Sequence, residues 1–415
     1  MVPKVSIAAL ILVLVTSLFG PASTLPNREL LADVSFPTGS APSLLSTNAF
    51  QSASGPPYSL YPSVPALFSF GDGGQDVGNV LYLGHDNSTK HYPFGTSFYN
   101  LTGRFSDGRV FADFFAQALG LPFLTPSLTP NGNFYQGASF ASASSGRFND
   151  TGDSDGFRGI PLLKQVDNFI QFQADARAYW AGFNSTYPPE RIPRYPMPEF
   201  FSRAIYMVQS GGNDLLNFRN QGLTPADIPA FATNMTAVYE TFVRALYATG
   251  ARKFFIMNIG LFGCTPLSIR NNNGSCGVLT NALCSNIVNQ TTALNSRLST
   301  QLLNSSFVQG DFYQFNLDVF NNPAAFGVVN ATGACCGSTT LSCPQLALAL
   351  ANTTAPYNGP VPLCPNPKEY LYWDTTHMSE SMTRILAHDI FGGSKYGKPK
   401  NMLQTFILPD LLNLQ

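Results

Sequence analysis

The sequence is poor in charged residues. Only 11% of its 415 residues are Asp, Glu, Lys or Arg, and the formal net charge is −1, whereas typical soluble domains carry about 25% charged residues. No basic stripe stands out in this near-neutral composition, so nucleic acid is not expected as a partner. Another group must then supply the solubility that charges usually supply.

Long apolar runs are also scarce. The longest follows Lys4, covers residues 5–19 and precedes Gly20-Pro21-Ala22. At about 15 residues it is too short to span a bilayer comfortably, because a span needs roughly 20. A charged start, an apolar centre and a small-residue end are typical of a cleaved secretory signal, with an uncleaved anchor as the alternative. We expect a signal peptide over residues 1–22, no integral membrane contact, and a protein secreted to the extracellular space or cell wall.

Histidine is scarce as well, with four residues, and the seven cysteines show no paired Cys-x-x-Cys spacing. We therefore expect no metal site and no other cofactor. All seven cysteines lie in the C-terminal half, which fits disulfides formed in an oxidising compartment. Cys276 is expected to pair with Cys284, and further pairs are expected within residues 335–364, with one cysteine left over.

Asn-x-Ser/Thr triplets are unusually frequent. Ten in one chain with few charges predict a surface that carries N-glycans. The ten acceptor residues are Asn87, Asn100, Asn149, Asn184, Asn234, Asn273, Asn289, Asn304, Asn330 and Asn352.

Apolar strand candidates alternate with helical periodicity after a Ser/Pro-rich lead over residues 23–63. Strands are expected over residues 64–70, 138–143, 204–208, 253–258 and 311–315, and helices over residues 109–119, 160–180, 225–248, 279–303 and 379–391. This alternation predicts an α/β fold of three α/β/α layers around a parallel sheet of about five strands. We expect one domain over residues 64–392, containing a long cysteine-stapled loop over residues 320–372, and a tail over residues 393–415.

Three polar clusters follow predicted strands or precede the last helix, over residues 71–79, 211–214 and 373–377. Ligand sites in parallel sheets form at the carboxyl ends of the strands. Of the four histidines, His377 alone stands in an Asp-x-x-His turn, where Asp374 can orient its imidazole as a base. Alone, such a turn is more often a capped surface turn. The glycines at 71, 73 and 74 do not have the spacing of a dinucleotide-binding loop.

Together these clusters resemble the plant-type GDSL esterase/lipase branch of the SGNH hydrolases, and the resemblance runs from about residue 64 to 392. The blocks that carry it are Phe70-Gly71-Asp72-Gly73, Asp76-Val77-Gly78-Asn79, residues 103–109 (Gly-Arg-Phe-Ser-Asp-Gly-Arg), residues 139–144, Gly211-Gly212-Asn213-Asp214 and residues 373–380.

The resemblance implies a flavodoxin-like fold and a role for each matching residue. His377 would be the general base and Asp374 its orienting partner. Asn213 would donate its side-chain N–H to the oxyanion, and the backbone N–H of Ser144 would be the second donor, with Gly146 as the rival placement. The nucleophile maps to Gly73, and because glycine has no side chain, acyl-enzyme chemistry is impossible there.

Replacement nucleophiles are not expected. Ser69 lies inside a strand, and Thr375 and Thr376 are directed elsewhere by the resemblance. We expect a secreted GDSL-like glycoprotein with lost or strongly reduced hydrolase activity, which retains a pocket for a small-molecule acyl ester or acylated glycoside. The alternative is an active esterase, lipase or acyltransferase that uses another nucleophile or a water activated by His377 in the vacated space. A purely structural glycoprotein is the third hypothesis.

Overall fold

The computed structural model describes residues 61, 63–84, 86–152, 159–182 and 193–412. The predicted signal peptide over 1–22, the predicted lead over 23–63 apart from residues 61 and 63, and the acceptor Asn184 lie outside the described residues.

A seven-stranded sheet in the order β2-β3-β1-β4-β5-β6-β9 forms the centre of the fold. Neighbouring strands pair in parallel except for β9, which is antiparallel to β6. The strands are β1 (Leu67–Gly71), β2 (Thr125–Pro126), β3 (Gly137–Ser139), β4 (Ile205–Gln209), β5 (Lys253–Met257), β6 (Ser306–Gly310) and β9 (Gly397–Lys398). This is the largely parallel sheet that the apolar runs predicted, extended by two short edge strands.

The expected strand over residues 311–315 is wrong. The strand is β6, and it ends before Asp311, whose side chain accepts a hydrogen bond from the backbone N–H of Gln314 at 3.3 Å. An aspartate that caps the backbone in this way starts a helix, and α9 (Phe312–Asn321) follows. The apolar face of 311–315 was therefore one side of a helix and not of a strand.

Three long helices cover one face of the sheet: α3 (Leu162–Ala181), α6 (Ile228–Ala248) and α8 (Val278–Gln301). Their apolar side chains form one buried cluster with every second residue of the strands, including Phe68, Phe70 and Phe254. In a strand successive side chains point to opposite faces. The strand residues that alternate with this cluster therefore face the other helical layer.

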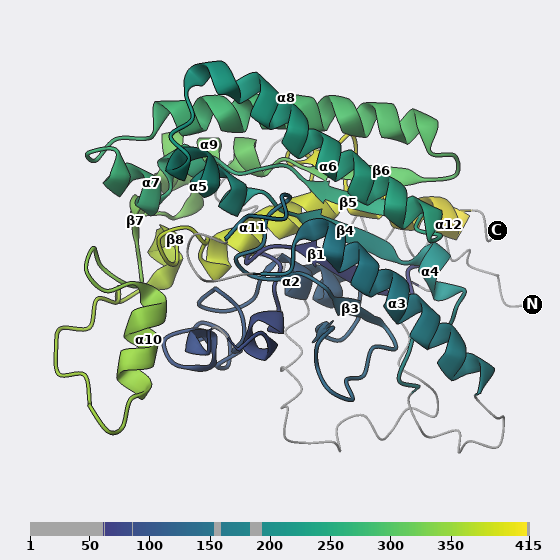
Figure 1. Cartoon of the computed structure of the whole chain (residues 1–415), viewed down its shortest axis with the longest axis horizontal. Coiled ribbons are helices and arrows are strands. Elements are labelled where there is room, and N and C mark those ends of the chain that lie inside the picture. The colour runs from purple at the N-terminus through teal and green to yellow at the C-terminus, as the bar shows by residue number, and fades with distance from the viewer. Residues whose placement is uncertain (1–60, 62, 85, 153–158, 183–192, 413–415) are drawn as a thin grey trace, which may run out of the picture. The chain divides into compact units, whose positions relative to one another are not determined.

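Two helices, α2 (Phe111–Ala118) and α11 (Glu380–Gly392), pack together on the opposite face. The rings of Phe115 in α2 and Phe255 in β5 pack edge to face, with their centroids 5.1 Å apart. The neighbouring Phe254 points to the face that is covered by α3, α6 and α8. The fold is thus three-layered, α/β/α, as the sequence predicted, and Figure 1 shows the two helical layers on either side of the strands.

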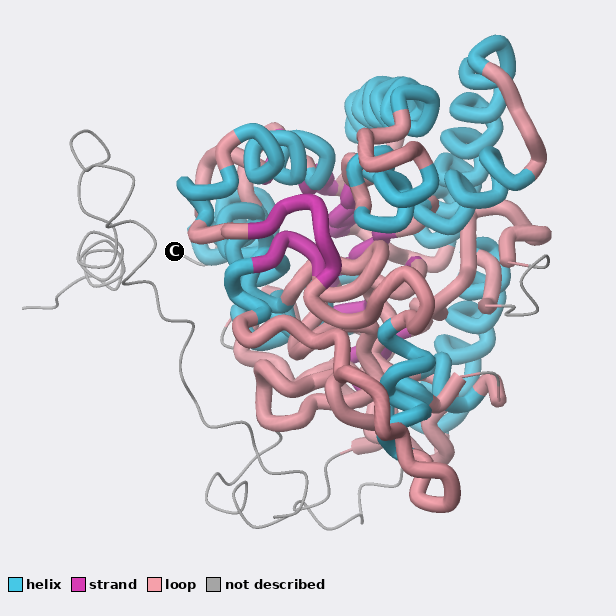
Figure 2. The backbone as a smooth tube through the Cα atoms, turned by 90° about the vertical axis from the view of Figure 1, so that its left-hand side faces the viewer, coloured by secondary structure: helices cyan, strands magenta, loops and turns pink. Residues whose placement is uncertain are grey.

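The predicted loop over residues 320–372 contains regular elements: a second sheet of β7 (Asn330–Ala334) and β8 (Tyr370–Tyr372), and α10 (Cys343–Ala351). Figure 2, viewed from the side on which Figure 1 places these elements, shows long loops below them.

The other α-helices of the described residues are α4 (Phe200–Arg203), α5 (Gly212–Asn220), α7 (Pro266–Asn271) and α12 (Leu408–Leu412). Residues 393–407 pack on the body, where β9 joins the sheet and Phe406 and Ile407 are buried.

Three disulfides are present among the described residues. Cys335–Cys364 and Cys336–Cys343 fall within the expected group, but the expected pair of Cys276 with Cys284 is wrong. Cys276 bonds to Cys264, with a Cα–Cα distance of 4.5 Å, which lies in the normal range. Cys284 is a fully buried free thiol on α8, in a buried cluster with Leu283 and Ile287.

Candidate active site

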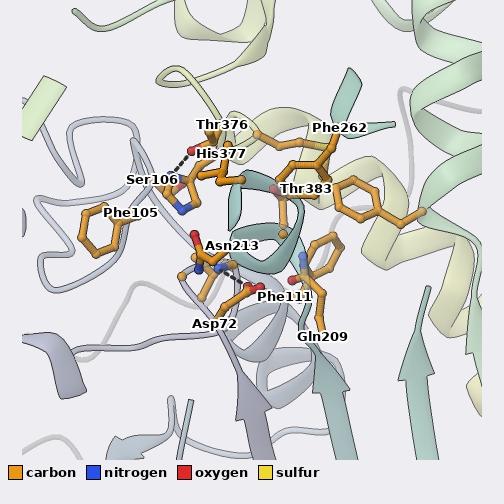
Figure 3. A pocket seen from close by; sticks show the side chains of 17 residues that line it. Asp72, Phe105, Ser106, Phe111, Gln209, Asn213, Phe262, Thr376, His377 and Thr383 are labelled. Atoms are coloured by element: carbon orange, nitrogen blue, oxygen red, sulfur yellow. Dashed lines mark hydrogen bonds between the residues drawn. The ribbon is translucent and has the colours of Figure 1, made fainter. Parts of the chain in front are cut away.

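The three polar clusters of the sequence meet at the carboxyl edge of the sheet. Gly73 follows β1, Asn213 lies in the first turn of α5 directly after β4, and His377 lies in the turn between β8 and α11. All three line one pocket, and Figure 3 shows the side chains of Asn213 and His377 facing each other across it. The sequence prediction that residues so far apart in the chain share one site therefore agrees with their placement.

Asp374 and His377 form a close pair within a single turn. The Nδ1 atom of His377 lies 2.8 Å from Oδ2 of Asp374, and the backbone N–H groups of Thr376 and His377 donate to Oδ1 at 2.8 and 2.7 Å. These bonds fix the carboxylate, which in turn holds the proton on Nδ1 and leaves Nε2 free to act as a base. The site therefore retains an oriented imidazole.

The electrostatics of this pair favour a charged imidazole. Burial by itself would lower the pKa of His377, but the negative charge of Asp374, its hydrogen bond and the charge of Asp72 raise the pKa above its usual value. For Asp374, burial acts to raise the pKa, and the attraction of His377 with the three hydrogen bonds lowers it overall. Each partner thus stabilises the charged form of the other.

Gly73 lies directly against this imidazole. A Cβ built on Gly73 would be 2.6 Å from Nε2 of His377, closer than real Cβ contacts. The imidazole therefore takes up space that a side chain at position 73 would need. A water activated by His377 would therefore have to lie elsewhere than at the Cβ position of residue 73.

The other hydroxyls considered from the sequence do not replace the serine. Ser69 is fully buried and donates to Oε1 of Gln75. Thr376 lies 3.3 Å from Nδ1, the nitrogen that faces Asp374, and not from Nε2. Thr375 is not among the described residues that line the pocket.

Asn213 is held beside the segment that carries the second predicted oxyanion donor. Its Nδ2 donates to the backbone carbonyl of Ser145 at 2.8 Å, which leaves one N–H of the amide for a ligand. Ser144 adopts a left-handed φ of 63°, a conformation that favours glycine. Neither Ser144 nor Gly146 lines the pocket in the described structure, so the role of the Ser144 N–H stays a prediction.

Asp72 is a site residue to which the sequence assigned no role. Its carboxylate accepts the backbone N–H groups of Gly74 at 3.3 Å and Gly211 at 3.2 Å, which joins the ends of β1 and β4 beneath the pocket. Burial raises its pKa to about 6, against the hydrogen bond from Gly74 and the attraction of His377. Its place in the turn between Gly71 and Gly73 was the signal available in the sequence.

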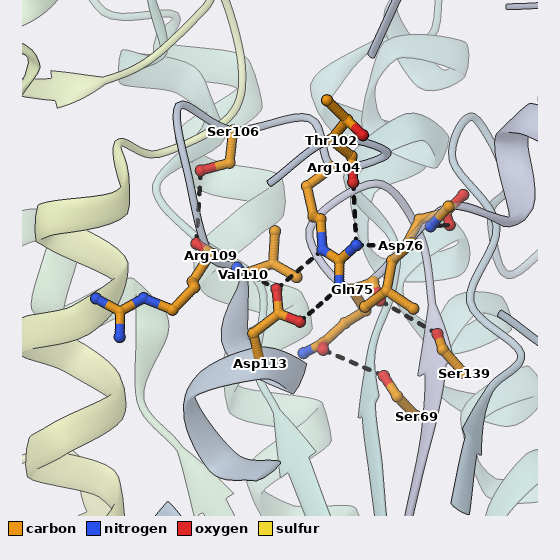
Figure 4. Close-up of polar contacts among 12 residues, drawn as sticks. Ser69, Gln75, Asp76, Thr102, Arg104, Ser106, Arg109, Val110, Asp113 and Ser139 are labelled. Carbon is orange, nitrogen blue, oxygen red and sulfur yellow. Dashed lines mark hydrogen bonds and ion pairs between the residues drawn. The ribbon is translucent and has the colours of Figure 1, made fainter. Parts of the chain in front are cut away.

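Phe105 is the second residue that sequence reasoning missed. Its ring stacks on the imidazole of His377, with centroids 5.2 Å apart and an interplanar angle of 23°. Its neighbour Arg104 is buried and bonds both carboxylate oxygens of Asp113, and it also donates to the carbonyls of Val77 and Thr102 (Figure 4). Phe105 therefore packs against the imidazole, and the bonds of Arg104 fix the backbone next to it.

The walls of the pocket are mainly apolar. They are formed by Val110, Phe111, Leu216, Phe262, Phe312 and Met378, while Gln209, Ser106 and Thr383 add polar atoms. An apolar wall with few polar groups is the usual composition of a small-molecule site. Within the described residues no group of His, Cys, Asp and Glu side chains could hold a metal ion, and none of the described helices is long and apolar enough to cross a membrane.

A parallel α/β sheet that presents an Asp–His pair and an amide at its carboxyl edge defines an ester-hydrolase type of scaffold. Comparison with known proteins agrees with this class: residues 67–390 match the family described as GDSL-like Lipase/Acylhydrolase. The chain is 32% identical over 366 residues to GDSL esterase/lipase LTL1 of Arabidopsis thaliana, a match that covers 83% of this chain and 91% of that protein. It is 30% identical over 354 residues to GDSL esterase/lipase 7 of the same plant, which covers 80% and 89%. The chain belongs to the GDSL esterase/lipase family.

Proposed function

We propose that this protein is a secreted, N-glycosylated family member that has lost most or all hydrolase activity and binds a small-molecule acyl ester or acylated glycoside. The observation that carries the proposal is Gly73 against Nε2 of His377. The position that should bear the attacking hydroxyl has no side chain, and the imidazole lies against the backbone there.

Two features support retained binding. His377 is hydrogen-bonded to Asp374, and His377 and Asn213 line the same pocket. The apolar walls around them bury hydrocarbon, which stabilises a bound acyl group by about 0.8 kcal/mol for each methylene. A site of this kind would hold an ester without forming an acyl-enzyme.

Direct hydrolysis is the second candidate function, and the intact Asp374–His377 pair favours it. A water on the pocket side of Nε2 would lose a proton to the imidazole and attack the ester carbonyl. Enzymes that lose a triad member keep a residual acceleration of roughly 10³ to 10⁴ over water from the oxyanion hole and binding alone. Weak turnover is compatible with this geometry, and efficient turnover is not.

The discriminating experiment compares three forms of the glycosylated protein on short- and long-chain acyl esters: unmodified, Gly73→Ser and His377→Ala. We expect ester binding without efficient turnover in the unmodified protein, and turnover in Gly73→Ser. Efficient turnover in the unmodified protein that disappears in His377→Ala would overturn the proposal in favour of direct hydrolysis. If no form binds or hydrolyses an ester, the proposal is wrong and the result favours a purely structural glycoprotein.

Secretion and glycosylation are supported by the surface positions of the acceptor residues. Eight of the nine described acceptors are exposed, and the ninth, Asn330, is half-buried, with its side-chain oxygen accepting the backbone N–H of Gly333. Expression through a eukaryotic secretory pathway should give protein in the medium whose mass falls after enzymatic removal of N-glycans. Retention inside the cell without any mass change would contradict this part of the proposal.

A further inference from the structure

A second, smaller cavity lies next to the pocket that contains His377. Leu216 and Phe262 line both cavities, so these two side chains form the partition between them. The remaining lining residues of the second cavity are Leu215, Thr265, Leu267, Ser268 and Thr280. They come from α5, from α7 with the residue before it, and from the first turn of α8.

The backbone of Phe262 is held in place, whereas its ring can be removed by a single substitution. The Phe262 carbonyl accepts the hydroxyl of Thr265 at 2.9 Å, and Cys264, two residues later, is fixed by its disulfide to Cys276. The ring itself rests on Gly212, where a Cβ would overlap its Cζ atom. The lack of a side chain at Gly212 therefore leaves room for the ring of Phe262 in the wall of the pocket (Figure 3).

The lining on both sides of this ring suits hydrocarbon. Phe111, Phe312 and Met378 lie on the side of His377, and Leu215 and Leu267 lie on the far side. The second cavity is also tied to the catalytic turn, because the backbone N–H of Leu267 donates to the carbonyl of Thr375 at 3.0 Å. An acyl chain whose carbonyl lies at His377 and Asn213 and whose tail runs along Leu216 would meet the ring of Phe262.

We propose that the second cavity is an extension of the acyl-binding site and that Phe262 closes it, so that Phe262 limits the length of the bound acyl chain. This inference rests on the proposed function, namely that the main pocket binds acyl esters. With Phe262 in place the site takes short acyl groups, and without its ring the two cavities join into one longer slot.

The test measures binding of methyl butanoate and methyl decanoate to the full-length glycosylated protein by calorimetry. Phe262→Ala should raise the affinity for decanoate relative to butanoate about tenfold, which corresponds to burying two further methylene groups. Phe262→Leu, a milder change, should give a smaller shift in the same direction if the alanine variant does not fold. Leu303→Ala is the control, because Leu303 is exposed and lines neither cavity, and it should leave the ratio unchanged.

A second substitution tests the route of the chain. Thr280 lines only the second cavity, so Thr280→Phe added to Phe262→Ala should fill that cavity and restore the short-chain preference. An unchanged ratio in both Phe262 variants, with butanoate still bound, would overturn the inference while leaving the proposed function intact. If neither ester binds to any form, the proposed function itself fails, and the inference fails with it.

Discussion

The imidazole of His377 lies against the backbone of Gly73, with Nε2 only 2.6 Å from the position of a Cβ at that residue. The space directly above the Cα of Gly73 is therefore taken up by the imidazole. In this position Nδ1 of His377 is hydrogen-bonded to Asp374. A serine at position 73 would require the ring to shift without breaking that bond.

The contact between Gly73 and His377 predicts coupling between them. Gly73→Ala should lower the free energy of unfolding by about 1–3 kcal/mol, the usual cost of overpacking. In a His377→Ala background the same substitution should cost much less, because the clashing atom is gone. Denaturant titration of the four proteins in this double-mutant cycle measures the coupling. Equal costs in both backgrounds would show that the imidazole does not occupy this space.

The raised pKa of His377 depends on Asp374. Asp374→Asn should lower the pKa of the imidazole, because it removes the attraction that offsets burial. Thr376→Val, which removes a neutral hydroxyl 3.3 Å from Nδ1, is the control and should change the pKa far less. Titration of the imidazole resonances by NMR measures both variants. A pKa unaffected by Asp374→Asn would mean that Asp72 or another charge controls the imidazole.

The buried Arg104–Asp113 pair should be the most costly ion pair to break. Arg104→Ala leaves the carboxylate of Asp113 buried and without its partner, a change that typically costs about 3–5 kcal/mol. Arg297→Ala, which breaks an exposed pair with Glu240, should cost about 1 kcal/mol or less. Chemical denaturation of the two variants gives the comparison. Similar losses would contradict the structural importance assigned to the 103–109 segment.

Buried carboxyl groups should make the protein more stable in mild acid than at neutral pH. Burial raises the pKa of Asp72, Asp76 and Asp107 to about 6. A pKa raised on folding means that the folded state binds more protons, so the stability from these groups is present at low pH and is lost as the pH rises through 6. The raised pKa of His377 acts in the same direction, and the lowered pKa of His388 opposes it.

Thermal melting at pH 5 and pH 7.5 should therefore differ by several degrees, with the higher midpoint at pH 5. Asp107→Asn is a suitable control variant, since its carbonyl can still accept the backbone N–H of Glu380. This variant should flatten the pH dependence without removing it. A higher midpoint at pH 7.5 in the unmodified protein would refute the prediction.

The disulfide pattern predicts one thiol that reacts only after unfolding. Cys284 is fully buried, and burial raises the pKa of its thiol to about 12, which suppresses the reactive thiolate. Alkylation of the native protein should label no cysteine, and alkylation in denaturant without reductant should label one. Peptide mapping should locate that label at Cys284. A label on Cys264 instead would show that Cys276 pairs with Cys284, as the sequence-based expectation had it.

Much of the fold and part of the site could be predicted because they depend on local patterns. Apolar segments of strand length alternate with helical periodicity, and this alternation is enough to predict a covered parallel sheet. The order of the blocks around Asp72, Asn213 and His377 located the site at one edge of that sheet. The ends of the strands were harder to predict from the sequence. The end of β6, for example, depends on the hydrogen bond by which Asp311 caps the following helix.

The sequence by itself determined that Gly73 cannot attack a carbonyl, because the absence of a hydroxyl is a property of one residue. It also determined the family, because the order of the motif blocks along the chain can be read without knowing how far apart they lie in space. The tertiary structure alone decided that Cys276 meets Cys264, that Phe105 stacks on His377, and that Phe262 stands between two cavities. Each of these depends on distances between segments that are brought together only when the helices pack on the sheet, and no local pattern of residues encodes such a distance.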